Sequence, residues 1–431
     1  MNTKGKHSIL LTLFFLLAQV AIAQQVSLIQ SNPGGIYNKG EKIEVVLQTH
    51  DLSVDSILIK TDRNYANAAP WETIENPRGE LVLFNGSYKE PTAIVVSVKV
   101  GDKITSTGLV VAPENFKPAT KRPKDFDKFW KAEKKALRKL PMELHRTPVE
   151  EADPGFVCYD MEINCTGPKP AWGYFAKPVN AKKGTLPIVL YVHAAGVNGD
   201  WCLSKPETAL EYAKKGNGVL AFDLNAHGML NGQPQKYYDD LQNGELRNYW
   251  EFGAENREEN YFRGMYLRLL RTLDFLCSQP EWDGKRILVI GESQGGGQAL
   301  AAAGLDHRVT AAIATVPAMC DFGRKLRGET GGWPNPFTFQ KDEKKMLATY
   351  PYFDDAHLLK GSKAKLITEI GLIDYTCPSS GIFAAINQNK GKKVTMVTTY
   401  RGHHLDQKEF QEDWEERIYK TKMQFIENYL K

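Results

Sequence analysis

The sequence predicts an α/β domain with a mostly parallel sheet, preceded by a small all-β domain of sandwich type. Up to about residue 113, apolar and polar residues alternate in short segments with little helical periodicity. Beyond residue 125, longer apolar strands alternate with helical stretches, which is the pattern of βαβ units. A length of 431 residues leaves room for two or three domains, each with its own core.

The first residues have the composition of a secretory signal peptide. Lys4 and Lys6 precede an apolar run over residues 9–17, and the small residues Ala21 and Ala23 follow it. The run is shorter than the roughly 20 residues that cross a bilayer, so we prefer cleavage near Ala23 to a membrane anchor. With residues 1–23 removed, we expect a protein exported to the periplasm or the exterior, with no membrane span.

Residues 24–113 are predicted to form the all-β, immunoglobulin-like domain. Four short strand candidates cover residues 42–47, 56–60, 80–84 and 93–100, and turn signals such as Asn-Pro and Asn-Gly separate them. No group of residues suited to catalysis is recognisable there. Aromatic side chains of this domain could bind a glycan, although we favour core packing or a spacer role. A linker with prolines and lysines, residues 114–124, leads to the second domain.

Residues 125–431 are predicted to form the α/β domain. An amphipathic helix opens at Asp125, and further helices are expected at residues 261–278, 296–304 and 413–430. Near-continuous apolar character is typical of strands that helices cover on both faces. The strand candidates of this kind cover residues 186–193, 219–223, 287–291, 309–316, 366–371 and 394–400.

The charge balance argues against a nucleic-acid partner. The chain has 55 Lys and Arg against 51 Asp and Glu residues, a formal net charge of +4, without a block of like charge. Its six cysteines form no Cys-x-x-Cys pair and no Cys/His group at metal-ligand spacing. We therefore expect no metal site, and the sequence leaves the disulfide pairing open.

Gly291-Glu-Ser-Gln-Gly295 follows one of the apolar strands and precedes a helix rich in small residues. In this context the motif indicates a nucleophile elbow, because glycines on both sides allow the sharp turn that lifts Ser293 above the sheet. The N–H of Gln294 would then lie at a helix N-terminus, where it can donate to an oxyanion. The alternative is a glycine-rich connection without a function, which the strand–turn–helix context disfavours.

A serine nucleophile needs a base and a carboxylate that orients the base. Asp374 follows the strand that ends at Gly371, and His403 follows the next strand. This gives the chain order Ser, Asp, His that α/β-hydrolases have. The adjacent His404 satisfies the same pattern, so spacing alone does not separate the two histidines.

The loop His193-Ala-Ala-Gly196 follows another apolar strand, where α/β-hydrolases carry a second N–H donor to the oxyanion. Ala194 and Ala195 are the candidates through their backbones. His193 is either structural, which we favour, or in contact with the substrate. His227 lies in a loop after the next strand and could line the same pocket.

From about Asp125 to the C-terminus, the sequence resembles the acetyl xylan esterase and cephalosporin-C deacetylase family of α/β-hydrolases. The resemblance rests on Ser-Gln-Gly-Gly at residues 293–296 combined with Gly-Leu-x-Asp at 371–374 and Cys-Pro at 377–378. Shorter matches lie at residues 126–130, 263–264, 271–276, 317–322 and 402–403. The motifs imply that Ser293 is the nucleophile, Asp374 the orienting acid and His403 the base, with backbone donors at Gln294 and Ala195.

The sequence departs from the family's pattern at three places. His404 stands where the family has Glu, the family's His-Gly-Tyr is His-Ala-Ala at residues 193–195, and its Arg-Gly-Gln gives way to Asn-Ala-His-Gly at residues 225–228. Residues 24–113 lie outside the resemblance.

The resemblance implies removal of small acyl groups, mainly acetate, from sugar hydroxyls without a metal or an organic cofactor. The substrate would be an acetylated oligo- or polysaccharide. Insertions at residues 225–260 and 323–345 carry aromatic side chains that could stack on sugar rings, although half or more of them could serve packing only. These side chains are Tyr237, Tyr238, Tyr249, Trp250 and Trp333.

Other functions remain open at this point. The serine could serve another exported hydrolase, a carboxylesterase or a peptidase, or the chain could be a catalytically silent glycan-binding protein that keeps the fold. Members of the resembled family often form closed oligomers. A homo-oligomer is therefore an open expectation, which the added N-terminal domain could block.

Overall fold

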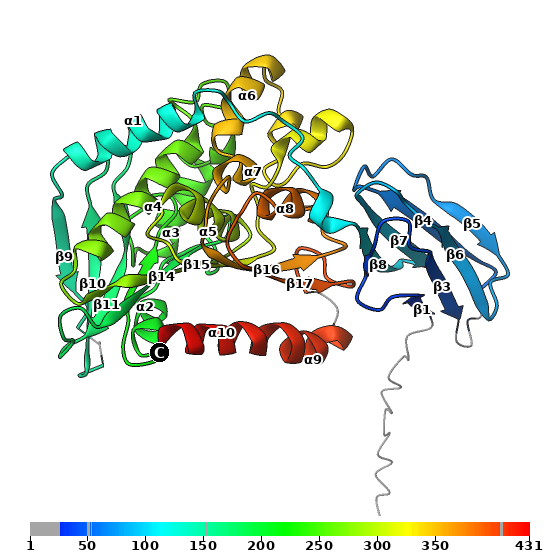
Figure 1. The fold of residues 1–431 in the computed structure, drawn as a ribbon, viewed down its shortest axis with the longest axis horizontal. Helices are drawn as coiled ribbons and strands as arrows, with labels where there is room; N and C mark the ends of the chain where they lie inside the picture. Colours follow the sequence, from blue (N-terminus) through cyan, green and yellow to red (C-terminus); the bar gives the residue numbers. More distant parts are fainter. Residues whose placement is uncertain (1–25, 50–51, 53, 151–152, 406–407) are drawn as a thin grey trace, which may run out of the picture.

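The structure is a computed structural model that describes residues 26–49, 52, 54–150, 153–405 and 408–431. The predicted signal peptide, residues 1–23, lies outside the described residues. Within them, the strands form sheets of three, five and nine strands. The two smaller sheets lie together at one end of the molecule, beside the large sheet and its helices (Figure 1).

The two smaller sheets form an N-terminal sandwich. Its strands are β1 (Val26–Gln30), β2 (Ile36–Tyr37), β3 (Ile43–Thr49), β4 (Ser56–Arg63), β5 (Glu72–Glu75), β6 (Glu80–Gly86), β7 (Thr92–Val100) and β8 (Lys103–Val111). One sheet has the order β1-β3-β6 and the other β2-β8-β7-β4-β5, and the strand pairs are antiparallel except β2 with β8. In β3 every second residue, from Ile43 to Leu47, is fully buried, because successive side chains point to opposite faces.

Strand β7 is buried on both faces. Ile94 and Val96 face the core of the sandwich. Val95 points the other way, into a cluster against which Ile373 and Tyr375 of the α/β part pack. An antiparallel strand open to water on one side would alternate in polarity, so the continuous apolar run of β7 reflects its covered outer face.

The large sheet carries the C-terminal part of the chain. Its strands are β9 (Leu144–Pro148), β10 (Phe156–Ile163), β11 (Ala171–Pro178), β12 (Leu186–Val192), β13 (Leu220–Leu224), β14 (Trp282–Glu292), β15 (Ala311–Thr315), β16 (Lys365–Gly371) and β17 (Lys393–Thr398). Their order is β17-β16-β15-β14-β12-β13-β11-β10-β9, parallel from β17 to β13 and antiparallel beyond it. The loops that follow β12, β14, β16 and β17 therefore meet at one edge of the sheet.

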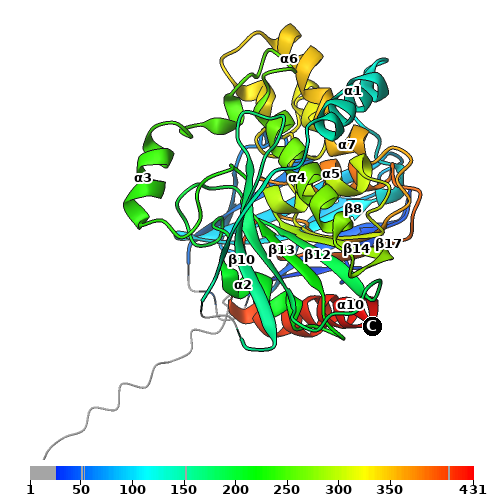
Figure 2. The ribbon, with the colours of Figure 1, turned by 90° about the vertical axis from the view of Figure 1, so that its left-hand side faces the viewer.

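Helices cover both faces of this sheet (Figure 2). They are α1 (Phe126–Lys139), α2 (Pro206–Ala213), α3 (Gln235–Asn243), α4 (Tyr261–Ser278), α5 (Gln294–Leu305), α6 (Glu343–Thr349), α7 (Asp355–Leu358), α8 (Ser379–Ile386), α9 (Gln411–Trp414) and α10 (Lys420–Leu430). Trp130 of α1, Leu273 of α4 and Leu300 of α5 belong to the main core on one face. Ala213 of α2 and Ile426 of α10 belong to a second core on the other face. No helix among the described residues has both the length and the apolar character to cross a bilayer.

The predicted fold class, a mostly parallel α/β sheet with an all-β region before it, is confirmed. Helix α4 has the bounds that the periodicity predicts, and the helix predicted over residues 413–430 is divided into α9, a π-helical turn at Glu415–Tyr419 and α10. Strands β10 and β11 are not predicted, because residues such as Asp160, Glu162 and Gly173 interrupt their apolar pattern. In the segment predicted as a linker, the N–H of Ala119 donates to Asp321 at 2.8 Å, so this segment packs on the α/β part.

Candidate active site

Ser293 lies in a sharp turn between β14 and α5. Its φ of 53° and ψ of −119° are a backbone conformation that non-glycine residues seldom adopt. A Cβ on Gly291 would lie 2.4 Å from the carbonyl of Gly295, and a Cβ on Gly295 would lie 2.3 Å from the carbonyl oxygen of Val192. The backbone therefore passes so closely on both sides of Ser293 that glycine is needed at each of the two motif positions.

Ser293, His403 and Asp374 are hydrogen-bonded in series. Nε2 of His403 lies 2.9 Å from Ser293 Oγ, and Nδ1 lies 2.9 Å from Oδ2 of Asp374. A carboxylate can only accept, so Nδ1 carries the proton and Nε2 is left to accept from the serine hydroxyl. His404, whose ring centroid lies 5.1 Å from that of His403, lines the cavity beside the series.

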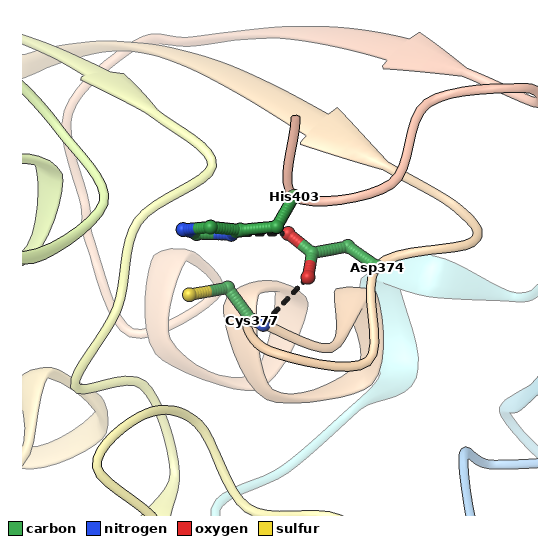
Figure 3. A group of neighbouring side chains, drawn as sticks. All are labelled: Asp374, Cys377 and His403. Carbon is green, nitrogen blue, oxygen red and sulfur yellow. Dashed lines mark hydrogen bonds and ion pairs between the residues drawn. The ribbon is translucent and has the colours of Figure 1, made fainter. Parts of the chain in front are cut away.

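Asp374 is fully buried, and the backbone that follows it holds its carboxylate in place. Oδ1 accepts the N–H groups of Thr376 and Cys377, each at 2.8 Å, while Oδ2 is bonded to His403. Figure 3 shows the imidazole of His403 and the backbone of Cys377 converging on this carboxylate. The segment from Leu372 to Cys377 therefore sets the direction in which Asp374 points.

Asp374, Cys377 and His403 also form a candidate metal-binding group in the described part of the chain. One ligand atom from each lies within 4.8 Å of the others (Figure 3). Burial, aided by the charge of Asp374, raises the pKa of the Cys377 thiol well above its ordinary value. A thiol must lose its proton to bind a metal, and Asp374 and His403 are already bonded to each other, so the geometry fits proton transfer better.

Two backbone groups next to Ser293 are the candidate oxyanion donors. Gln294 is the first residue of α5, so its N–H has no acceptor within the helix. Ala194 and Ala195 line the same cavity as Ser293, from the loop after β12. The side chain of Gln294 is buried and accepts from the hydroxyl of Tyr249 at 2.7 Å, which ties the start of α5 to the insertion that carries Tyr249.

His193, the first residue of the loop after β12, is buried and does not line the cavity. Its Nε2 pairs with the fully buried carboxylate of Asp223, and its Nδ1 is 3.3 Å from the carbonyl oxygen of Trp201. Burial opposes the charged form, but the carboxylate outweighs it and raises the pKa of His193. Both ring nitrogens face acceptors, so His193 ties the start of this loop to Asp223 and to the backbone at Trp201.

His227 is also buried rather than open to the cavity at Ser293. Its Nε2 donates to the carbonyl oxygen of Gly196 at 2.7 Å, and its Nδ1 accepts from the hydroxyl of Tyr261. Burial lowers the pKa of His227 to about 3, so the ring is neutral at physiological pH. Neither His193 nor His227 lines the cavity at Ser293, and both make hydrogen bonds to the segment from Gly196 to Trp201.

A cavity of about 790 Å³ opens beside Ser293 and His403. Trp333 lines it, whereas Trp250 does not and lies against Trp333, with ring centroids 6.0 Å apart. The residues that line the cavity are Tyr191, Ala194, Ala195, Trp201, Glu292, Ser293, Trp333, Thr376, His403 and His404.

Trp201 is the cavity residue that sequence reasoning misses most clearly. Its side chain is 65% exposed, and its indole N–H donates to the carbonyl oxygen of Ala195 at 2.9 Å. It therefore borders the oxyanion loop while presenting a large apolar face to solvent. The signal in the sequence is its position in the loop after β12, at the edge of the sheet where Ser293 lies, and outside the two longer insertions at residues 225–260 and 323–345.

A mostly parallel sheet with a strained serine, a histidine and a buried aspartate in series at its carboxyl edge is typical of an α/β-hydrolase. The chain belongs to the acetyl xylan esterase (AXE1) family, whose family model matches residues 112–425. It is a carboxylic-ester hydrolase of the acetylesterase type.

Several esterases are similar to this chain. The acetyl esterase Axe7A of Xylanibacter ruminicola is 29% identical over 93% of this chain and 94% of its own length. The solved acetyl xylan esterase from Paenibacillus sp. R4 is 29% identical with a TM-score of 0.60, covering 74% of this chain and 98% of its own. Acetyl xylan esterase 1 from Thermoanaerobacterium sp. JW/SL YS485 has the same TM-score and coverage at 22% identity, a similarity of fold.

Proposed function

We propose that the chain is an exported serine esterase that removes acetyl groups from acetylated sugars or polysaccharides. The observation that carries this proposal is the hydrogen-bond series from Ser293 through His403 to Asp374, with 2.9 Å at both steps. The family assignment supports an ester as the substrate, and the acetyl group is the acyl group in the names of the relatives.

The geometry supports a double-displacement mechanism. Ser293 Oγ attacks the ester carbonyl carbon while His403 Nε2 takes the hydroxyl proton, and Asp374 stabilises the imidazolium that forms. The N–H groups of Gln294 and Ala195 bind the oxyanion, and each donor of this kind is worth about 3–4 kcal/mol. His403 then gives its proton to the departing sugar oxygen, leaving an acetyl-enzyme.

A water molecule then hydrolyses the acetyl-enzyme, and His403 and Ser293 take part again. His403 takes a proton from a water molecule as that water attacks the acetyl carbonyl, and it returns the proton to Ser293 Oγ as acetate leaves. The step needs no cofactor, since the serine supplies the nucleophile and the histidine carries the proton in both directions.

The cavity supports a sugar as the alcohol part of the ester. Trp333 and Trp201 border it, and indole faces stack on the apolar faces of sugar rings. Both line the same cavity as Ser293, so a sugar ring stacked on either indole would lie in the cavity that holds the nucleophile.

Export and domain organisation are further parts of the proposal. The composition of residues 1–23 supports cleavage near Ala23 and release to the periplasm or the exterior. We likewise propose the division into an all-β domain at residues 24–113, a connecting segment at 114–124 and an esterase domain at 125–431.

Acetate release from p-nitrophenyl acetate and from acetylated xylan tests the proposal. We expect the wild-type enzyme to release acetate from both, and the Ser293→Ala variant to lose several orders of magnitude in kcat. Ser97→Ala is a matched control, because Ser97 is as buried as Ser293, 8% exposed in each case, but lies in the sandwich.

The other outcomes separate the alternatives. Activity on the small ester alone keeps the serine esterase and moves the physiological substrate elsewhere. Serine-dependent cleavage of peptides indicates a peptidase. Retention on insoluble polysaccharide without any serine-dependent release indicates a glycan-binding protein and contradicts the proposal.

A further inference from the structure

The outer face of the five-stranded N-terminal sheet lies against the loops that carry Asp374 and His403. Figure 1 shows the sandwich beside the end of the large sheet formed by β16 and β17, and these are the strands before the two loops. Val95 of β7 packs with Ile373 and Tyr375, which are the two neighbours of Asp374 in the chain. The sandwich therefore contacts the segment that sets the direction of the Asp374 carboxylate.

Tyr65 reaches from the sandwich into this segment. It lies in the turn after β4, with a φ of 58°, a backbone conformation unfavourable for a bulky side chain. Its hydroxyl is buried and donates to the carbonyl oxygen of Leu372 at 2.9 Å. The phenol has one proton, so the contact with Ser379 Oγ at 2.7 Å is one in which Ser379 donates. Tyr65 thus binds the chain on both sides of Asp374.

A second contact holds the residue directly after Asp374. The hydroxyl of Tyr375 donates to Oδ2 of Asp62 at 2.7 Å, and the Asp62 carboxylate is itself held by the N–H of Asn67. The rings of Tyr65 and Tyr375 meet edge to face with centroids 5.3 Å apart. Burial raises the pKa of both phenols, so both hydroxyls keep their protons at neutral pH and can donate hydrogen bonds.

One glycine of the sandwich touches both loops. The N–H of Gly108 in β8 donates to the carbonyl oxygen of Thr399, four residues before His403. A Cβ on Gly108 would lie 2.3 Å from the carbonyl oxygen of Leu372. The backbones of the sandwich, the Asp374 loop and the His403 loop are therefore in direct contact, with no space for a side chain between them.

We propose that the N-terminal sandwich is a working part of the active site, with Tyr65 as a positioning residue for Asp374. This inference rests on the proposed function. By fixing Leu372, Tyr375 and Ser379, the sandwich sets the backbone whose N–H groups hold the Asp374 carboxylate. That carboxylate in turn orients the imidazole of His403 toward Ser293 and stabilises its protonated form.

The Tyr65→Phe variant tests this directly, because it keeps the ring and removes only the hydroxyl. We expect kcat on p-nitrophenyl acetate to fall about tenfold with little change in KM, since the cavity that binds substrate is untouched. The acidic limb of the kcat/KM profile should also move to lower pH, by about half a unit, because a less firmly held carboxylate stabilises the imidazolium less. The groups that face the imidazole are Asp374, the Cys377 thiol, Ser293 and His404.

Tyr37→Phe is the matched control. Tyr37 is as buried as Tyr65, 1% exposed in each case, but its hydroxyl bonds within the sandwich, to Asn32 N at 2.9 Å. A merely structural role for Tyr65 would lower the amount of folded enzyme in both variants and leave the midpoint of the acidic limb unchanged. If Tyr65→Phe does not fold, Tyr375→Phe supplies the same test, since it removes the bond to Asp62 from a side chain that is only partly buried.

The outcomes separate this inference from the proposed function. A lowered kcat with a shifted limb in Tyr65→Phe or Tyr375→Phe, absent from Tyr37→Phe, supports it. If activity depends on Ser293 but Tyr65→Phe and Tyr375→Phe have the same kcat and the same midpoint of the acidic limb as Tyr37→Phe, this inference alone is overturned. An enzyme whose activity survives Ser293→Ala overturns the proposed mechanism and this inference together.

Discussion

At the scale of the residue, the backbone of Ser293 is held in a conformation it would not adopt alone. A strained φ/ψ pair costs about 1–3 kcal/mol and persists only where its surroundings fix it. The N–H of Ser293 donates to the carbonyl oxygen of Thr315, and its carbonyl oxygen accepts from Gly297 and Ala318. These bonds join the turn at Ser293 to β15 and to α5, so the backbone of Ser293 is fixed by the fold itself.

The burial of His227 should make the free energy of unfolding depend on pH. The folded protein holds His227 neutral with a pKa lowered to about 3, whereas the unfolded chain binds a proton below about pH 6.5. Between these values the unfolded state binds more protons, so the free energy of unfolding should fall as the pH falls, by about 1.4 kcal/mol per unit from this residue.

Denaturant unfolding from pH 7 to pH 4 measures this dependence. His227→Gln should show a smaller loss of stability on acidification than the wild-type protein, while substitution of the exposed His145 by Gln should leave the dependence unchanged. His357, whose pKa burial lowers to about 4, contributes in the same direction and keeps part of the slope in the His227 variant. If the free energy of unfolding of His227→Gln falls with pH as steeply as that of the wild-type protein, the assignment of a neutral, buried His227 is contradicted.

The residues with the strictest geometric demands are the ones that the sequence predicts best. Ser293 needs glycines at fixed positions and Asp374 follows a recognisable strand, so local sequence carries their signal. His193 and His227 resemble pocket residues in sequence, and their burial depends on partners distant in the chain, Asp223 and Tyr261. Local patterns contain no information about such partners.

At the scale of the element, the C-terminal helical segment supports the His403 loop through buried charges. Glu369 of β16 is fully buried and accepts from Arg401, from Lys422 of α10 and, at 2.7 Å, from the indole of Trp414. Arg401 lies two residues before His403 and also pairs at 3.1 Å with Glu292, the residue before Ser293. This network joins β16, α10 and the His403 loop.

The Glu369→Gln variant should lose about 3–5 kcal/mol of unfolding free energy. It leaves the buried cations of Arg401 and Lys422 without their shared carboxylate, and an uncompensated buried charge has a cost of this size. Glu416→Gln, which breaks the exposed pair with Lys420 on the same segment, should change stability by less than about 1 kcal/mol. Equal effects in urea unfolding would contradict a role for the buried network.

Helices and strands with a regular or continuous apolar pattern were predictable from the sequence. Those in which polar and apolar residues are mixed without a regular pattern were not. Helix α4 and strands β12 and β16 are marked by continuous or periodic apolar residues. Strand β14 extends five residues before the predicted start at Ile287, because its first half is polar and partly exposed. Its pairing with β12 begins at Trp282, opposite Leu186, so tertiary contacts decide where the strand begins.

At the scale of the whole molecule, the main feature that the sequence does not reveal is how the sandwich sits against the esterase part. The apolar run of β7 indicates a covered outer face, but nothing in it names Ile373 and Tyr375 as the cover. Contacts between residues some 300 positions apart, such as Tyr65 with Leu372, depend on both parts being folded. The all-β region and the α/β part were therefore predictable separately, and their joint construction of the site was not.

The measurement that tests the central claim most directly is the identification of the acetylated residue during turnover. The enzyme is mixed rapidly with p-nitrophenyl acetate, quenched in acid and digested, and the peptides are examined by mass spectrometry. We predict one acetyl group on the peptide that contains Ser293, and none on that peptide from Ser293→Ala. Turnover without acetylation of Ser293, or an acetyl group carried by another residue on the catalytic timescale, would contradict the account.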